Sequence, residues 1–111
     1  MMLFLLCVAI PAQAAFEGPN STADVNSAAQ VAGAADNAGC LLEGNIVEKI
    51  TGSKDKYTFK DATGTVVVEI DDHVFAGRKV TPAMTVRLTG KVDTSKTKPS
   101  KVDVKTLEIK P

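Results

Sequence analysis

The sequence predicts an all-β domain, in which five strands form a small barrel and one short helix precedes them. The main evidence is the stretch from Tyr57 to Asp71, which contains a complete β-hairpin. Its apolar residues alternate with polar ones on both sides of the central Asp61-Ala62-Thr63-Gly64, as in two half-buried strands. Asp61 can bond its own backbone two residues on, and Gly64 can adopt φ > 0 where the chain reverses. Three further stretches have strand character, and no stretch has a long helical pattern.

The first fourteen residues are typical of a secretory signal peptide. Met2 to Ile10 is an unbroken run of nine apolar residues, and Ala12 and Ala14 are the small residues that signal peptidase requires before a cut at Ala15. The run is too short to span a bilayer core of about 30 Å. No Lys or Arg precedes it, so we expect that a basic beginning has been lost; a frayed apolar N-terminus is the alternative. The sequence therefore predicts an exported chain that does not span the membrane.

The 111 residues suffice for one domain, and their charges are unevenly distributed. Residues 15–48 hold five acidic and no basic residues, whereas residues 49–111 hold 13 basic and 8 acidic ones. A basic half can attract anionic polymers or lipid surfaces, although interleaved Lys and Asp are also found on an ordinary solvated sheet. Cys40 is the one cysteine that follows the signal, so no internal disulfide can stabilise the exported domain.

Residues 15–37 should form a leader and a short helix. Ser21 can cap the first turn together with Asp24, and an apolar stripe follows at helical spacing: Val25, Ala28, Ala29 and Ala32. Gly33 and Gly39 bracket the expected end of the helix. The stripe buries little apolar area, so we expect the helix to lie over one end of the sheet. An Ala-rich disordered arm is the alternative.

The first predicted strand covers residues 41–50 and should be bent. Its apolar positions change parity, since Leu42 and Ile46 are even and Leu41 and Val47 are odd, with Gly44 between them. A glycine inside a strand commonly marks a bulge or a sharp bend. A bent first strand can pair with both halves of a small barrel.

The second half of the chain supplies the last two strands. Residues 72–84 form a crossing connection that is too short for much helix, and strand 85–92 then alternates regularly between apolar and polar residues. Residues 94–101 read as a polar, basic hairpin loop. Strand 102–109 changes phase, which requires a bulge near Lys105-Thr106.

These elements together describe a small five-stranded Greek-key barrel of the OB type with a short N-terminal helix. An aligned β-sandwich is the alternative, but it usually has about seven strands. The predicted organisation is a signal peptide at 1–14, a leader and short helix at 15–37, and an OB-fold domain at 38–111.

Several motifs of this domain carry a resemblance to a known family: Gly44, Ile46, Tyr57-Thr58-Phe59, Asp61, Gly64, Val68-Glu69-Ile70-Asp71, Gly90, Val92-Asp93 and Val102-Asp103-Val104. They resemble the bacterial OB-fold (BOF) family, the NirD/YgiW/YdeI-like periplasmic stress-tolerance proteins, over about residues 38–109. The resemblance implies a soluble periplasmic domain that is raised under envelope, oxidative, metal or antimicrobial-peptide stress. It implies a binding protein rather than an enzyme, with no catalytic residues or cofactor to carry over. Phe75, beside His73, stands where the family would place Trp, so a Trp stacking contact is not expected.

Five residues are candidates for a ligand-binding face, on or near the strands that bind ligands in many OB domains: Tyr57, Lys60, Glu69, Asp71 and Arg87. The pair Tyr57 and Phe59 could stack a flat ligand, or it could belong to the core. The charged candidates are outward by parity, and they could instead form ion pairs on a solvated sheet. Tyr57 and Lys60 have opposite parity, so they share a face only if the strand twists or bulges between them.

Other chemistry finds less support in the residue pattern. Nucleic-acid binding would need more aromatic residues and a net basic face. The run Asp71-Asp72-His73 offers metal-ligand types, but three consecutive residues cannot all converge, so no metal site is assigned. Cys40 has no His nearby in sequence and is interpreted as a buried thiol. No nucleophile is paired with a base, which argues against an enzyme.

Two functions follow from these observations. The first is a binding protein of envelope stress tolerance, whose partner is a cell-envelope component (peptidoglycan, lipopolysaccharide or an envelope protein) or a small ligand. The alternative is a stress protein that binds a small ion or a metal.

Overall fold

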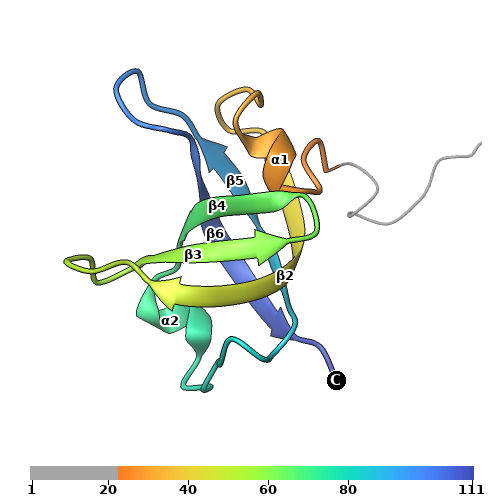
Figure 1. Cartoon of the computed structure of the whole chain (residues 1–111), viewed down its shortest axis with the longest axis vertical. Helices are drawn as coiled ribbons and strands as arrows, with labels where there is room; N and C mark the ends of the chain where they lie inside the picture. The colour runs from red at the N-terminus through yellow and green to blue at the C-terminus, as the bar shows by residue number, and fades with distance from the viewer. Residues whose placement is uncertain (1–22) are drawn as a thin grey trace, which may run out of the picture.

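The computed structural model describes residues 23–111 as a β-barrel with two short helices (Figure 1). The predicted signal peptide, its cut site and the cap at Ser21 lie outside the described residues. Within residues 23–111, no helix has the length and apolar character needed to cross a membrane.

Five strands close the barrel: β2 (Gly39–Lys49), β3 (Lys56–Asp61), β4 (Gly64–Glu69), β5 (Val86–Asp93) and β6 (Lys101–Ile109). They are hydrogen-bonded in the order β2-β3-β4-β6-β5, and β5 pairs with β2 to complete the circle. Neighbours run antiparallel except for β4 and β6, which are parallel. This order confirms the predicted five-stranded OB barrel with its crossing between the third and fourth strands.

The bend in β2 lies where the strand changes partners. Residues 39–44 pair with β5, and residues 45–49 pair with β3. At the changeover, a Cβ on Gly44 would lie 2.4 Å from the Lys60 carbonyl oxygen, so only glycine fits there. The expected change of parity at Gly44 is wrong, because even-numbered residues stay buried from Cys40 to Ile46 and the irregularity comes at Val47.

The β3–β4 hairpin has the register and turn that alternation predicted. Asp61 pairs with Gly64 across a two-residue turn, and Phe59 pairs with Val66. The backbone N–H of Thr63 donates to Asp61 Oδ1 at 2.8 Å, and Gly64 has φ of 149°. Asp61 therefore accepts a hydrogen bond from the turn, and Gly64 supplies the positive φ that the turn requires.

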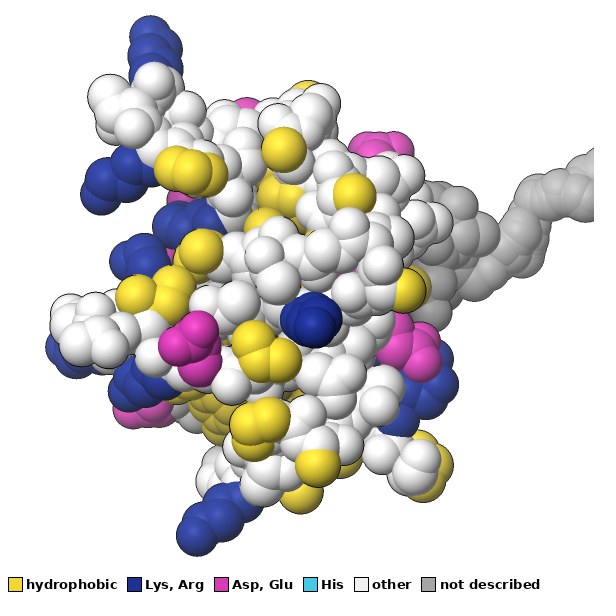
Figure 2. All heavy atoms as spheres, in the orientation of Figure 1, with side chains coloured by type: hydrophobic (Ala, Val, Ile, Leu, Met, Phe, Trp, Pro, Cys, Tyr) yellow, Lys and Arg dark blue, Asp and Glu magenta, His cyan; other side chains and the backbone are white. Residues whose placement is uncertain are grey.

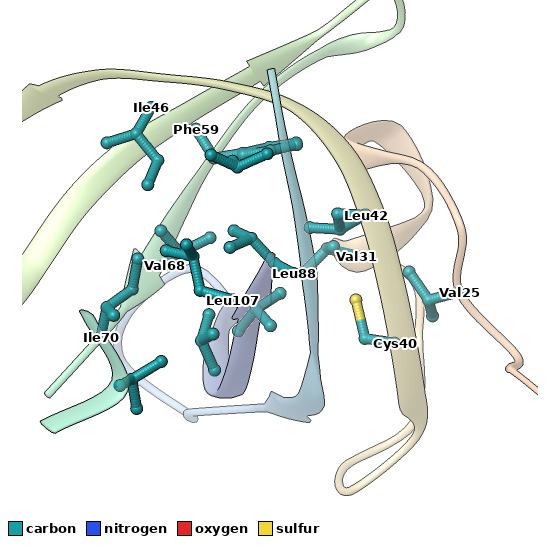
Figure 3. Close-up of a cluster of buried hydrophobic side chains, with 14 of the residues drawn as sticks. Val25, Val31, Cys40, Leu42, Ile46, Phe59, Val68, Ile70, Leu88 and Leu107 are labelled. Carbon is teal, nitrogen blue, oxygen red and sulfur yellow. The ribbon is translucent and has the colours of Figure 1, made fainter. Parts of the chain in front are cut away.

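The core is built from the inner residues of every strand and closed at one end by the N-terminal segment (Figure 3). Its fully buried side chains are Phe59, Leu42, Ile70, Leu88, Val25, Val31, Val68, Val86, Val92, Val102 and Cys40. No polar or charged residue is buried in the described part of the chain. The barrel is thus held by apolar packing, and its polar chemistry lies on the outside.

The predicted bulge in β6 is confirmed. Thr89 pairs with Thr106, but Gly90 pairs with Val104, which leaves Lys105 as the extra residue. The inner face of β6 accordingly passes from Val104 to Leu107.

The N-terminal helix α1 (Ala28–Val31) is shorter than the sequence predicted and begins later. Val25 lies outside the helix and forms an isolated parallel bridge with Cys40 of β2. The helical spacing of Val25 and Ala28 therefore predicted a stripe that does not form, because hydrogen bonds to the start of β2 satisfy the backbone of this segment before the helix begins.

The turn of the β3–β4 hairpin holds the start of α1. The N–H of Ala28 donates to Asp61 Oδ2 at 2.9 Å, and the N–H of Ala29 donates to Thr63 Oγ1 at 3.0 Å. Burial alone would raise the pKa of Asp61, but the bonds from Thr63 and from backbone N–H groups lower it. The cap of α1 thus comes from another element rather than from its own sequence.

The crossing connection between β4 and β5 contains one helical turn, α2 (Asp72–Phe75), as its short length predicted. Ala76 follows in the left-handed region with φ of 54°. The Asn45 side-chain amide donates to the carbonyl oxygens of Pro82 and Met84, at 3.0 and 2.9 Å, and so fixes the end of the connection against β2.

Candidate functional site

The outer face of the β3–β4 hairpin lies between two projecting loops, residues 50–55 and residues 94–100 (Figure 1). Its cross-strand pairs are Lys56 with Glu69, Thr58 with Val67, and Lys60 with Thr65. Lysine and arginine side chains gather on the side where the two loops project, at the left of Figure 2. The hairpin alternation explains why this face carries both charged residues and one apolar residue, Val67.

A groove of about 430 Å³ runs over this face and reaches both loops. Ile50, Val67 and Pro99 give it apolar walls. The remaining lining residues are polar or charged: Lys56, Glu69, Asp93, Ser95, Lys98 and Lys101. We call this concavity the hairpin groove. Apolar walls with a few polar groups are the usual make-up of a ligand site.

Lys101 ties three strands together at the base of the hairpin groove. Its Nζ lies 3.1 Å from Glu69 Oε1 on β4 and also donates to Asp93 Oδ2 on β5. The bond to Asp93 raises the pKa of Lys101, partial burial lowers it, and Glu69 raises it further, with a net rise. These charges are balanced within the protein, so a ligand in the groove meets ion pairs rather than an electrostatic field of one sign.

Three carboxylates meet beside the groove. Oxygen atoms of Asp55, Glu69 and Asp71 all lie within 4.8 Å of one another. Carboxylate oxygens are the ligands that Ca²⁺ and Mg²⁺ prefer. Lys101 contacts Glu69, and Lys56 lies 4.0 Å from Asp55, so two ammonium groups already balance part of this charge.

Comparison with known proteins identifies the family. The chain matches the family described as Bacterial OB fold (BOF) protein over residues 8–109. It belongs to the BOF family. It is 40% identical over 80 residues to the calcium-regulated OB-fold protein CarO of Pseudomonas aeruginosa, a match that covers 72% of this chain and 67% of CarO. It is also 40% identical over 92 residues to YgiW of Escherichia coli K12, covering 73% of this chain and 69% of YgiW.

Solved structures share the fold of this chain. The structure of YgiW from E. coli superposes with a TM-score of 0.72 at 37% sequence identity, covering 87% of this chain and 99% of that one. The telomere capping protein Ten1 from Saccharomyces pombe reaches a TM-score of 0.59 at 14% identity, covering 78% of this chain and 80% of Ten1. The second likeness concerns the fold alone.

The BOF barrel brings some of the predicted binding residues together. Glu69 lines the hairpin groove, and Asp71 lies beside it. Lys60 is exposed on the same outer face but beyond the groove lining. A role of these residues in binding stays a prediction.

Tyr57 lies on the inner face of the hairpin, at the rim of the core. Its ring packs edge-on against Phe75 with centroids 5.5 Å apart, and Lys49 Nζ lies 5.9 Å from the ring centroid. Burial, followed by Asp72 and Asp55, raises the pKa of Tyr57. Tyr57 and Lys60 therefore do not share a face, as their parity indicated.

Arg87, the fifth candidate, does not line the hairpin groove. Its guanidinium sits on the outer face of β5 between Glu43 and Glu108, at 3.6 and 3.7 Å. It is six positions along β5 from Asp93 at the groove, roughly 20 Å along the strand. Parity predicted its outward direction correctly, but parity does not say which side of a closed barrel an outward residue faces.

Sequence reasoning missed Ile50 and Val67 as groove residues. Val67 carried a usable signal, because it is an apolar residue on the polar parity of a half-buried strand. Ile50 carried none, since it lies at a strand end where alternation stops.

Proposed function

We propose that this BOF-family protein is a non-catalytic binding protein of the periplasm, which captures a cell-envelope component in the hairpin groove and serves stress tolerance. The observation that carries the proposal is the position of the groove. It lies over the second and third strands of the barrel and between the loops that follow the first and fourth strands. OB domains bind extended ligands such as oligosaccharides at this place.

The chemistry of the groove supports binding rather than catalysis. Its titratable side chains are lysines and carboxylates, and Lys101, Glu69 and Asp93 are paired with one another. Cys40 is buried in the core, and burial raises its pKa to about 11, so the thiol stays protonated at neutral pH. Ion pairs beside apolar walls suit recognition of a polar polymer or peptide.

The periplasmic location rests on the apolar run Met2–Ile10 and the small residues that follow it. Membership of the BOF family supports a role in stress, and the relative CarO is named as calcium-regulated. Purification of the exported protein and measurement of its intact mass test the location, with a start at Ala15 expected.

The alternative function is the binding of a small ion, and the convergence of Asp55, Glu69 and Asp71 favours it. Lys56 and Lys101 oppose it, because their ammonium groups lie beside the same carboxylates. A thermal-shift titration with CaCl₂ separates the two functions, since a bound ion raises the melting temperature with concentration. An increase that Asp71→Asn removes would favour the ion.

Capture on purified envelope components tests the proposed function. Peptidoglycan sacculi, lipopolysaccharide and solubilised envelope proteins are each offered to the mature chain. The double variant Lys56→Ala, Lys98→Ala removes two groove lysines and should weaken capture tenfold or more, a loss of about 1.4 kcal/mol. Its melting temperature should change little, because exposed ion pairs contribute about 0–1 kcal/mol.

The matched control is Lys54→Ala, Lys96→Ala, which removes one exposed lysine from each of the two loops that flank the groove, both outside its lining. It should bind like the parent. Equal weakening by both double variants would indicate general electrostatic attraction, and capture of none of the three components would refute the proposed function.

A further inference from the structure

β4 has one fully paired edge and one edge that is mostly free. Along its whole length, from Gly64 to Glu69, it pairs with β3. On the other side it pairs with β6 at Val68 and Glu69 alone. Within residues 23–111, the segment 64–67 therefore has no strand partner on this side, although the barrel as a whole is closed.

The free edge presents hydrogen-bonding groups. The N–H of Ile70 donates to the Asp55 carbonyl, on the β3 side, and successive residues of a strand direct their backbone groups to opposite sides. The backbone groups of Thr65, Val67 and Glu69 therefore point away from β3. In a parallel pair, the bridge of Val68 to Val102 is made by the neighbours of Val68, so the Val67 C=O and the Glu69 N–H already face Val102. Glu69 meets Asp103 on β6, whereas Thr65 is exposed and has no strand partner on this side in the described chain. Among the described residues, its N–H and C=O have no backbone partner on this side.

A slot of about 510 Å³ lies along this free edge. Ala28 and Ala32, in and just after α1, line one part of it, and the β5–β6 loop lines another (Figure 1). Its full lining is Ala28, Ala32, Thr58, Thr65, Val66, Val67, Ser95, Lys98, Pro99 and Ser100. We call it the β4 slot; it shares Val67, Lys98 and Pro99 with the hairpin groove.

The composition of the β4 slot selects among ligands. Lys98 is the one charged residue among the described residues that line it, and the others are small, apolar or hydroxyl side chains. The slot therefore favours a partner with a carboxylate near Lys98 and small apolar side chains elsewhere. The edge residues 64–67 extend about 13 Å, the length of four residues of strand.

We propose that the β4 slot accepts an extended acidic peptide segment of an envelope protein as an added strand. The added segment would bond to the N–H and C=O of Thr65 and to the N–H of Val67, place alternate side chains over the hairpin face, and set an acidic side chain against Lys98. The inference rests on the proposed function, because it names one class of envelope component as the partner. A glycan is the less favoured occupant, since it does not present alternating N–H and C=O groups at the strand repeat.

The first test uses a defined probe, an acetylated seven-residue peptide in which valine alternates with threonine and glutamate. Its binding to the mature chain is followed by fluorescence anisotropy. Hydrogen exchange of the Thr65 amide should slow at least tenfold at saturating peptide, because that amide becomes hydrogen-bonded. The Thr89 amide, in a strand with partners on both sides, serves as the internal reference.

Two methylated peptides test the geometry of strand addition. N-methylation at alternate residues blocks one edge of an extended peptide and leaves the other edge intact. Methylation of one register should weaken binding tenfold or more, while methylation of the other register should leave it unchanged. Equal effects of the two peptides would overturn the proposal.

Two exposed lysines of one loop give a matched pair of variants. Lys98→Glu should weaken peptide binding at least tenfold, whereas Lys96→Glu, outside the slot lining, should not. Thr65→Pro removes the free backbone donor at an edge position that tolerates proline, and it should weaken binding of the peptide at least tenfold by anisotropy. If Thr65→Pro does not fold, the methylated peptides decide the same question.

The outcomes separate this proposal from the proposed function. If the chain still captures sacculi or lipopolysaccharide but does not bind the peptide, strand addition is wrong and the envelope-binding function stands. If it captures no envelope component and does not bind the peptide, both are wrong. Protection of Thr65 in concentrated protein without peptide would mean that a second copy fills the slot, and would also overturn the proposal.

Discussion

Substitution of Gly90 by alanine should be destabilising, because a Cβ at this position of β5 would overlap the backbone of β6. A Cβ on Gly90 would lie 2.1 Å from the Asp103 carbonyl oxygen. It would also lie 2.9 Å from the Asp103 carbonyl carbon and from the Val104 Cα. All three neighbours are backbone atoms, so no side-chain rotation can relieve the contact.

The cost follows from how far the strands must separate. Non-bonded heavy atoms are most favourable at about 3.5–4.0 Å, so β6 would have to move away by roughly 1 Å or more. Overpacking in a well-packed core typically costs about 1–3 kcal/mol. Each kcal/mol lowers the melting temperature of a domain of this size by about 4–8 °C, so a fall of about 4–24 °C is expected.

Gly39→Ala is the matched control, since it adds the same methyl group to another strand glycine with nothing within 4 Å of the new Cβ. Thermal melting followed by circular dichroism measures both variants. Gly39→Ala should melt within a few degrees of the parent. If Gly90→Ala melts as high as Gly39→Ala, the close approach of β5 and β6 is not as the structure describes it.

Two further predictions concern titratable side chains. Asp61→Ala should destabilise the fold by about 1 kcal/mol at pH 7, because Ala28 and Thr63 lose their acceptor. The folded pKa of Asp61 lies below its ordinary value of 3.8, so the stabilisation is present above that pH and is lost as the pH falls through the folded pKa. In denaturant unfolding, the difference in free energy of unfolding between Asp61→Ala and the parent should shrink below about pH 4, and a constant difference would contradict the assignment. Asp24→Asn, at an exposed residue, is the control. The Cys40 thiol should resist disulfide reagents at pH 8 in the folded chain and react on unfolding, and rapid labelling of the folded chain would refute its burial. The parent should also lose stability relative to Cys40→Ala between pH 9.0 and about 11, because the thiol ionises at lower pH in the unfolded chain than in the folded one.

Sequence alone determined the features of this protein that depend on neighbouring residues. Alternation within residues 57–71 predicted the hairpin, Asp61 and Gly64 predicted its turn, and the change of phase near Lys105 predicted the bulge. These features are local, because a strand of period two fixes which residues share a face. Counting the strands and their crossing then gave the barrel.

Tertiary structure decided which outward residues become neighbours. Glu69 and Arg87 have the same outward character in sequence, but closure of the barrel places Glu69 at the hairpin groove and Arg87 between Glu43 and Glu108. The start of α1 also depends on distant residues, since Asp61 supplies its cap. The free edge of β4 exists because β6 pairs with it at two positions alone. Such pairings join residues far apart in the chain, so no local pattern of side chains encodes them.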